Sequence, residues 1–551
     1  MRARLAMVWT GPTPLRNNRP RKQKEMDIGT ISLVLLIGMI LLLAIGMPLG
    51  FASGFLAVVV MVMKFGPDLL FSNFGTGPLN ILSQRIYGIA TSYVLVSVPL
   101  FILMANLLER SGIARDMYDT LEAWMNRTRG GIAVVTALMA VVMAAMSGII
   151  GGEVVLLGLI ALPQMLRLGY DQNLAIGTIC ASGSLGTMIP PSIVLIFYGL
   201  ITDTSIHALF QAAFVPGLIL AGCYIIYILI RTNLNPALAP LPEPKETDLT
   251  GAQKRVYGAA LILMLVGAAA AIMVVRGLYL NAFDLIESDT GGITAGYITN
   301  AAILAVLCAG LLWFWIGKGN AVAAWAAGKG MVAPLLIVFV VLGSIYGGIT
   351  GITEAAGIGA MAVLLLIILR GEFSWGLLRE ASMRTFRSTG TIMWVTIGAT
   401  ALAGAYTLAG GPTFVANLIV GLDLPTLGVL LIMMVVFLFM GAFMDWTGIV
   451  LLVMPVFLPI VLKLPWDELG LTGGLDTKMA VQVWFGILFC VNMQVSFLSP
   501  PFGGAAFYLK SVAPPHITLP QIFRSFLPFM GIQIMVLMLI LLVPQITTLF
   551  L

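Results

Sequence analysis

The chain has 551 residues, of which 60% are hydrophobic and only 10% charged, and its mean hydropathy is +1.03. A soluble protein of this length needs roughly 25% charged residues to solvate its surface, so the composition excludes a soluble globular protein. The net charge of +5 therefore indicates basic loops on the cytoplasmic side of a membrane, and we expect no nucleic acid as a partner.

Several enzyme and cofactor classes are excluded by the rarity of the residues that they require. The chain has only two histidines, His207 and His516. Its four cysteines stand singly in apolar stretches: Cys180, Cys223, Cys308 and Cys490. Because neither residue type forms a pair with ligand spacing, the sequence argues against a zinc site, a haem bundle or a histidine-dependent intramembrane protease.

The first predicted segment is a basic N-terminal extension, residues 1–25, with seven Arg and Lys residues. The apolar run that follows is too long for a signal peptide and has no small-residue cleavage site. We therefore interpret this run as a retained membrane span.

Residues 26–230 are predicted to form a first structural repeat of membrane helices. A span needs about 20 apolar residues, and long runs of this kind recur here. In chain order we expect an apolar block at 28–65, a half-polar arm at 66–92, a span at 93–108, a hairpin-like block at 131–163 interrupted at 147–152, a span broken at 185–192, and a span that ends at 230.

Residues 331–551 show the same order and are predicted to form a second repeat. The expected elements are an apolar block at 332–369, a charged arm at 370–390, a span, a hairpin-like block at 425–462 interrupted at 445–448, a span broken at 497–503, and a final span from 526. Matched features are offset by 298 residues from Ser147 to Asp445 and by 310 from Pro190 to Pro500. Both arms read as amphipathic helices that lie in the membrane interface and brace a scaffold.

Between the repeats, residues 231–330 form an insertion. It begins with a proline-rich linker and continues with two extra spans, at 256–275 and 297–317, which flank an acidic loop. Because two spans are an even number, the insertion leaves the orientation of the second repeat unchanged.

Basic residues set the orientation of the two repeats. The loops that we assign to the cytoplasm hold 17 Lys and Arg, and the opposite loops hold 5. This assignment places the first arm outside and the second inside, so the halves are predicted to be inverted copies, as in secondary transporters. It also places the basic extension outside, where positive charge resists translocation. We therefore expect synthesis to start at Met26, which mass spectrometry of the N-terminus would detect.

Two interrupted helices carry a predicted ion site, because helices in hydrocarbon break only where they line a cavity or are covered by protein. The Pro-Pro pairs at 190–191 and 500–501 free carbonyls one turn upstream, and nearby glycines let the backbone approach an ion. With hydroxyl and amide side chains, including Ser192, they predict an oxygen cage for Na⁺, a hard cation. The predicted ligands are Ser184, Gly186, Thr187, Pro190, Asn492, Gln494, Ser499, Pro500 and Gly503. A simple proline kink is the alternative.

The hairpin tips are predicted to bind a small organic anion. Helices that start at a tip point amide donors inward, which suits a negative charge. The predicted substrate-binding residues are Ser147, Gly148, Thr187, Asp445, Thr447 and Ser499. Asp445 could lie near the sodium cage or pair with a backbone turn. Two further carboxylates, Glu153 and Glu354, are expected to be buried and could instead pair with a neighbouring helix.

Several ordered motifs resemble the large membrane subunit of TRAP transporters, the tripartite ATP-independent periplasmic family with DctM-like permeases. They are VPLF at 98–101, AMSG at 145–148, GSLGTMIPPS at 183–192, YGGITGITEAA at 346–356, MGAFMD at 440–445 and NMQVSFLSPPFG at 492–503. The resemblance covers nearly the whole chain apart from residues 1–25 and the insertion.

The resemblance implies an all-α polytopic protein of a bacterial inner membrane, with inverted repeats, re-entrant hairpins and broken helices. It implies an elevator-type carrier that is driven by a Na⁺ gradient and is not an enzyme. The expected partners are a small four-helix membrane subunit and a periplasmic substrate-binding protein. Family substrates are mainly carboxylates, namely C4-dicarboxylates, sialic acids and keto acids.

Two departures from the family pattern keep the substrate open. The first tip reads SGIIGGE at 147–153 rather than a run rich in Ser, Ala and Thr. The insertion resembles a longer branch linked to mannitol, chloroaromatic and keto-acid systems. A stand-alone ion-coupled dicarboxylate symporter is the alternative with the same architecture, and a membrane-embedded enzyme is the alternative from another class.

Overall fold

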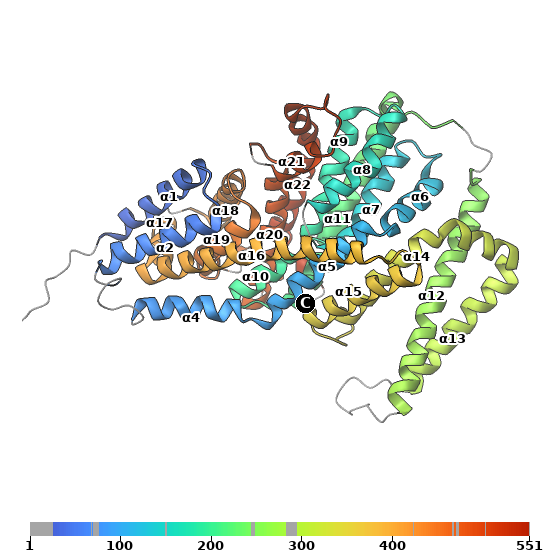
Figure 1. Ribbon diagram of the computed structural model, residues 1–551, viewed down its shortest axis with the longest axis horizontal. Coiled ribbons are helices and arrows are strands. Elements are labelled where there is room, and N and C mark those ends of the chain that lie inside the picture. Colours follow the sequence, from blue (N-terminus) through green and yellow to red (C-terminus); the bar gives the residue numbers. More distant parts are fainter. Residues whose placement is uncertain are drawn as a thin grey trace, which may run out of the picture.

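The computed structural model describes residues 26–551 except 68, 70–76, 149–150, 244–247, 283–294, 422–423, 466–467, 470–472, 476, 502 and 550–551. The described part is helical and contains no strand (Figure 1). Nine of its helical segments are long and apolar enough to cross a membrane, and six shorter apolar helices of 10–17 residues accompany them. The expectation of an all-α polytopic membrane protein is therefore confirmed.

The first half contains twelve described elements before the insertion. They are α1 (Ile28–Ala44), α2 (Leu49–Phe65), α4 (Pro78–Ala90), η1 (Tyr93–Val96), α5 (Ser97–Arg110), α6 (Ile113–Met125), α7 (Gly131–Ser147), α8 (Gly152–Arg167), α9 (Gln172–Gly183), η2 (Leu185–Thr187), α10 (Ile193–Thr202) and α11 (Ile206–Leu234). The apolar block at 28–65 is thus two helices. Gly46, with a φ of 90°, and Pro48, the N-cap of α2, separate them.

The insertion contains a short 3₁₀ helix, two longer helices and a π-helical segment. They are η3 (Pro236–Leu238), α12 (Gly251–Ala282), α13 (Ala295–Leu311) and the π-helical segment η4 (Leu312–Ile316). Figure 1 shows α12 and α13 as a hairpin at one end of the molecule, where α12 packs on α14. The acidic loop expected between them, with Asp284, Glu287 and Asp289, lies outside the described residues.

Ten helices are described in the second half. They are α14 (Lys318–Tyr346), α15 (Ile352–Leu369), α16 (Trp375–Ala409), α17 (Gly411–Val420), α18 (Thr426–Gly441), α19 (Trp446–Val461), α20 (Lys478–Leu498), α21 (Gly504–Lys510), α22 (Leu519–Leu542) and α23 (Gln545–Thr548). The order of arm, hairpin and broken helix recurs in both halves. Their inverted orientation and the boundaries at 230 and 330 stay predictions.

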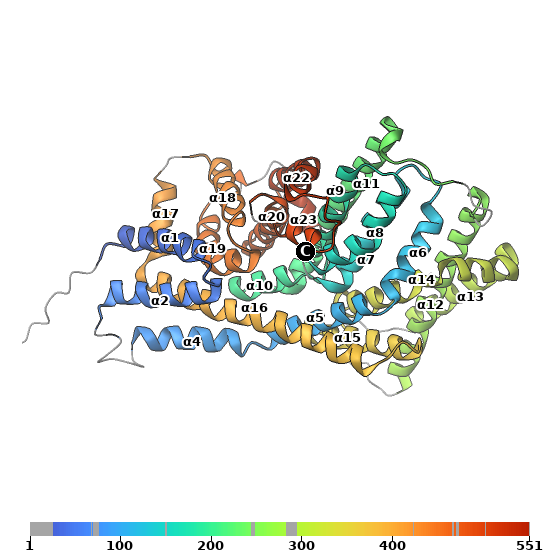
Figure 2. The ribbon, with the colours of Figure 1, turned by 45° about the horizontal axis from the view of Figure 1, so that its top comes forward.

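The second arm differs from its prediction, because arm and following span are one helix, α16, of 35 residues. At 1.5 Å per residue it is about 52 Å long, and Figures 1 and 2 show it running across most of the molecule. It packs on α2, α4, α5 and α19. At its crossing with α2, a Cβ atom on Gly398 would lie 2.1 Å from the Gly50 carbonyl oxygen, so only glycine permits this approach.

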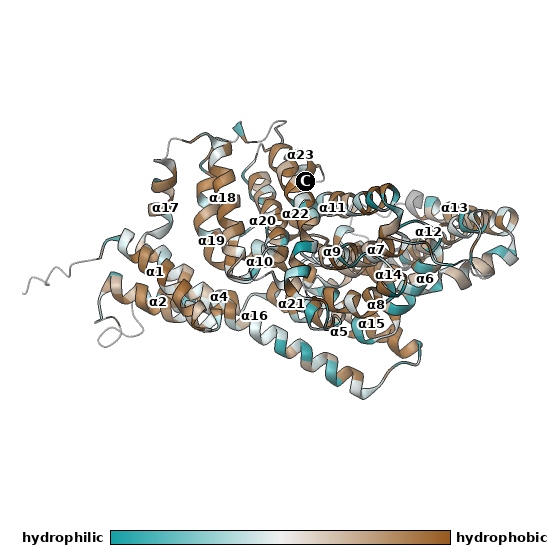
Figure 3. Cartoon of the chain, turned by 90° about the horizontal axis from the view of Figure 1, so that it is seen from above, coloured by the Kyte–Doolittle hydropathy of each residue, from teal (hydrophilic) through white to brown (hydrophobic). Residues whose placement is uncertain are grey.

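Polar contacts join the N-terminal part of α16 to the first half. Arg110 of α5 forms an ion pair with Glu380 of α16, and the guanidinium of Arg370, which follows α15 and precedes α16, lies 2.5 Å from Asp116 of α6. Figure 3 shows this part of α16 as more hydrophilic than the helices around it. The arm thus carries its charge where it contacts the first half of the chain. That it lies in the membrane interface and braces a scaffold stays a prediction.

Glu354 corrects an expectation of burial. Its side chain is exposed at the start of α15, and the Tyr93 hydroxyl donates a hydrogen bond to it at 3.0 Å. The contact joins η1 to α15, so Glu354 has the alternative structural role that its sequence position allowed.

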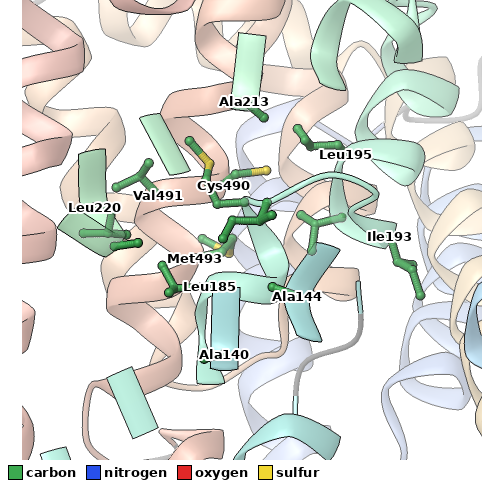
Figure 4. Packing of buried hydrophobic residues seen from close by; sticks show 14 of the residues in the cluster. Ala140, Ala144, Leu185, Ile193, Leu195, Ala213, Leu220, Cys490, Val491 and Met493 are labelled. Atoms are coloured by element: carbon green, nitrogen blue, oxygen red, sulfur yellow. The ribbon is translucent and has the colours of Figure 1, made fainter. Parts of the chain in front are cut away.

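The core is built around α20, the most enclosed of the candidate spans, with 89% of its apolar window buried. This helix packs on α18 and α19 of the second hairpin, on η2 and α10 of the first broken helix, and on α11, α21 and α22. In Figure 4, Leu185 of η2 lies against Val491 and Met493 of α20, with Ala140 and Ala144 of α7 beside them. The first break therefore packs against the helix that leads into the second one. Pro190 and Pro191 are buried, whereas Pro500 and Pro501 of the second break are exposed.

Candidate transport site at two helix breaks

The tip of the first hairpin is seated on the first helix break. α7 ends at Gly148, whose φ is 58°, and the Ile193 amide donates to the Gly148 carbonyl at 3.5 Å. A Cβ atom on Gly148 would lie 2.1 Å from the Pro191 carbonyl oxygen. Both the positive φ and the close approach require glycine, so the hairpin tip and the break form one unit.

The first break is held by buried hydroxyl groups. Pro190 and Pro191 lack the N–H groups that the Gly186 and Thr187 carbonyls would accept from in a continuous helix. The Ser192 hydroxyl replaces one of them by donating to the Thr187 carbonyl at 2.5 Å. The Gly186 carbonyl does not gain such a side-chain donor from Ser192. The break is therefore a locally stabilised interruption.

Other predicted ligands in this break are also tied into the fold. The Thr187 hydroxyl donates to the Ser184 carbonyl at 2.9 Å, and the Gln533 amide of α22 donates to the Ser184 hydroxyl at 3.2 Å. All three side chains are fully buried. A hydroxyl that donates to a carbonyl keeps its lone pairs, so these groups can still accept a cation.

Glu153 is the ionisable group of this region. It lies in the first turn of α8 with a side chain 2% exposed, and Ser147 donates a hydrogen bond to its Oε1 atom. Its Oε2 atom has no hydrogen-bond partner. A Cβ atom on Gly186 would lie 3.1 Å from Oε1, so the carboxylate rests directly against the break.

The second break holds amide groups with unused hydrogen-bonding capacity. The Ser499 hydroxyl and backbone amide both donate to the Ser496 carbonyl at 3.1 Å, upstream of Pro500, and Gly503 precedes α21. Asn492 donates to the Met434 carbonyl of α18 at 2.9 Å, but its Oδ1 atom has no partner. Both polar atoms of the buried Gln494 side chain are likewise unpartnered. Phe502 lies outside the described residues.

The tip of the second hairpin is a capped helix start. Asp445 is the N-cap of α19 and accepts from the Gly448 amide at 3.3 Å, while Thr447 is buried in the first turn. Of the two surroundings that the sequence left open for Asp445, the structure shows the backbone turn. The Asp445 residue is exposed, because it faces a cavity.

This cavity has a volume of about 320 Å³ and lies between the second tip, α20 and α21. It is lined by Gly441, Phe443, Met444, Asp445, Trp446, Met493, Ser496, Phe497, Gly504 and Tyr508. Of the predicted substrate-binding residues, only Asp445 is part of the lining. The others, Ser147, Gly148, Thr187, Thr447 and Ser499, lie behind it in the two hairpin–break units.

Tyr508 is the lining residue that sequence reasoning missed and that connects the two halves. A Cβ atom on Gly151 of the first tip would lie 2.7 Å from the Tyr508 ring, so ring and tip are in contact. Phe497 packs beside it with ring centroids 6.2 Å apart. An aromatic residue in an apolar stretch reads as core, so only the packing of α21 against α8 reveals it.

The residues of the breaks fit a hard monovalent cation better than a transition metal. Among the described residues no group of three or more His, Cys, Asp or Glu side chains could hold a metal ion. Three of the buried side-chain oxygens that have no hydrogen-bond partner lie on helices next to the two breaks: Glu153 Oε2, Asn492 Oδ1 and Gln494 Oε1. Oxygen ligands of this kind suit Na⁺, and a buried polar atom without a partner calls for one.

Comparison with known proteins identifies the family. The model of the family "Tripartite ATP-independent periplasmic transporter, DctM component" matches residues 36–546. The chain belongs to this family. It is accordingly a large permease subunit of a TRAP transporter and not an enzyme, as the sequence motifs implied.

Individual TRAP permeases resemble the chain over most of its length. The C4-dicarboxylate TRAP transporter large permease protein DctM of Pseudomonas aeruginosa is 26% identical over 496 residues, which cover 89% of this chain and 92% of the relative. The ectoine TRAP transporter large permease protein TeaC of Halomonas elongata is 29% identical over 61% of this chain and 74% of the relative. The isethionate TRAP transporter permease protein DctMQ of Oleidesulfovibrio alaskensis is 24% identical, covering 93% of this chain and 65% of the relative.

A solved structure supports the fold. The YdaH transporter of Alcanivorax borkumensis, whose topology is described as unusual, superposes with a TM-score of 0.50 at 13% identity. The superposition covers 93% of this chain and 97% of that one. At this identity the likeness concerns the arrangement of helices alone.

Proposed function

We propose that the protein carries out sodium-driven uptake of a small organic anion across a bacterial inner membrane, as the large permease subunit of a TRAP transporter. The observation that supports this most directly is the set of buried, donor-free oxygens at the two helix breaks. Leaving such groups without a partner in a membrane protein is costly, and a bound cation is the partner that their chemistry favours.

The cavity at the second tip is the proposed substrate site. Its lining contains no Lys or Arg, and it contains one carboxylate, that of Asp445. An anion bound there therefore needs positive charge from a co-bound cation, together with the amide groups at the start of α19. Coupling to Na⁺ supplies that charge, which links the two parts of the proposal.

The substrate class follows from the relatives and from this charge balance. The relatives named above are described as permeases for C4-dicarboxylates, ectoine and isethionate. We favour a small carboxylate, such as a C4-dicarboxylate or a keto acid, delivered by a periplasmic substrate-binding protein. A small four-helix membrane subunit would brace the scaffold of α2, α4, α5 and α16.

The proposed mechanism is an elevator. The two hairpins and two broken helices form one unit through mutual contacts: the second hairpin and the first broken helix pack on α20, and the first hairpin packs on α9, η2 and α21. The long helix α16 runs alongside and contacts this unit through α19. Such a division lets the unit carry the site past the scaffold while its internal contacts stay intact.

The experiment is uptake into proteoliposomes that contain the permease and its small subunit, with the binding protein outside. We expect uptake of a carboxylate only with an inward Na⁺ gradient and with the binding protein present. Equal uptake with K⁺ in place of Na⁺ would reject sodium coupling. Uptake that is independent of the binding protein would favour the stand-alone symporter. A panel of dicarboxylates, keto acids and ectoine, tested as competitors, would define the substrate.

A further inference from the structure

Glu153 has an environment that neither a structural pair nor the family likeness explains. Its side chain is 2% exposed, one carboxylate oxygen accepts from the Ser147 hydroxyl, and Oε2 has no partner. A single neutral hydroxyl does not compensate the removal of a charged carboxylate from water. Something else must balance this group.

No basic side chain supplies that balance. Among the described residues, Glu109 at the end of α5 is the charged group that acts on Glu153, and it is itself a carboxylate. A Cβ atom added to Gly152 would lie 2.1 Å from Glu109 Oε1. Glu109 therefore contacts the same first turn of α8 that holds Glu153. The nearby Arg110 is already paired with Glu380. Arg384 and Arg110 act on Glu109, and neither acts on Glu153.

Further oxygen atoms belong to the hairpin tip and the helix break beside Glu153. Gly186 packs against the carboxylate, and Pro190 leaves the Gly186 carbonyl without its helical donor. The Pro191 carbonyl points at Gly148 of the hairpin tip. A carboxylate, a hydroxyl and backbone carbonyls form a ligand set for a hard cation, and a charged ligand strengthens such a site.

We infer that the Glu153 carboxylate is a ligand of the coupling cation, bound between the first hairpin tip and the first helix break. This inference rests on the proposed sodium coupling and deepens it. The cation site in the first half would then have a charged ligand and the higher affinity for the cation. The second half offers amide and hydroxyl oxygens from Asn492, Gln494 and Ser499 for a weaker one.

The competing possibility is a protonated Glu153 that acts only as a hydrogen-bonded core residue. The two differ in what glutamine does at this position, because Glu153→Gln keeps size and hydrogen bonding but removes the charge. A neutral structural carboxyl tolerates this change. A cation ligand does not.

The test is thermal unfolding of the purified permease, without substrate, over a series of NaCl concentrations at constant ionic strength with KCl. We expect Na⁺ to raise the unfolding temperature of the wild type. Glu153→Gln should raise the half-saturating Na⁺ concentration at least about 30-fold, because it removes the charged ligand. Glu354→Gln is the matched control, since it removes an exposed carboxylate that contacts Tyr93, and it should respond like the wild type.

The outcomes separate the inference from the function on which it rests. A wild type that responds equally to Na⁺ and K⁺ would reject sodium coupling itself. A sodium response in the wild type that is unchanged in Glu153→Gln would overturn only the role of Glu153. If Glu153→Gln does not yield folded protein, the same unfolding series on Glu153→Asp tests the role of Glu153. A shortened but charged ligand should shift the half-saturating concentration about tenfold, and an unshifted value would contradict the inference.

Discussion

At each hairpin tip a helix begins beside one carboxylate, but the two carboxylates lie in different surroundings. Asp445 stands one residue before α19, caps it, and faces a cavity of about 320 Å³. Glu153 stands inside the first turn of α8, is buried, and contacts the helix break behind it. A shift of a few residues relative to the helix start thus turns one acid toward the cavity and the other toward the break.

The comparison suggests a division of labour between the halves. The first tip is closed against its break by the contact of Gly148 with Pro191. The second tip opens on the cavity. The following variants test this division, beginning with the largest expected effect.

Gly148→Ala tests the close packing of the first tip against its break and should have the largest effect. The added Cβ atom would lie 2.1 Å from the Pro191 carbonyl oxygen at a residue whose φ is 58°. We expect uptake to fall at least about tenfold and the free energy of unfolding to fall by about 2–5 kcal/mol. Uptake assays and thermal unfolding measure the two effects. Gly54→Ala in α2 is the control, since no atom lies within 4 Å of its added Cβ.

The cavity side of the comparison is tested by Asp445→Asn. Asparagine caps a helix as well as aspartate does, so folding should be unchanged, while the loss of charge should weaken Na⁺-dependent uptake about tenfold. Concentration series of Na⁺ and substrate would show which of the two affinities changes. In Asp445→Ala the cap is lost as well, at a cost of about 1 kcal/mol. Wild-type uptake by Asp445→Asn would remove Asp445 from the site.

The smallest difference is expected between the hydroxyls of the two breaks. Ser192 donates to the Thr187 carbonyl at 2.5 Å and caps α10, so Ser192→Ala should lower the free energy of unfolding by about 1–2 kcal/mol. Ser499 shares its acceptor, the Ser496 carbonyl, with its own backbone amide. Ser499→Ala should therefore lower the free energy of unfolding by only about 0.5–1 kcal/mol. Its main effect should be weaker Na⁺-dependent uptake. A larger loss of unfolding free energy in Ser499→Ala than in Ser192→Ala would contradict this prediction.

The sequence was most informative where local chemistry decides the structure. Proline pairs at 190–191 and 500–501 cannot continue a helix, and glycine at 148 permits a left-handed turn, so the positions of both breaks and both hairpins could be predicted. The span boundaries were less well predicted. The block at 332–369 is two helices, and the arm at 370–390 continues into the following span as α16, because no proline or left-handed glycine interrupts residues 375–409.

The sequence by itself determined that this chain is a membrane protein, because long runs without charge are stable only where lipid or protein surrounds them. It also determined that the spans are helices, because a backbone in lipid must pair its own polar groups. Only the tertiary structure decided which polar groups share a site. The exposure of Asp445 and Glu354, the burial of Glu153 and the contact of Tyr508 with Gly151 depend on helices that are distant in the chain. The packing of α20 and α21 against both hairpins brings these groups together, and no local pattern encodes that packing.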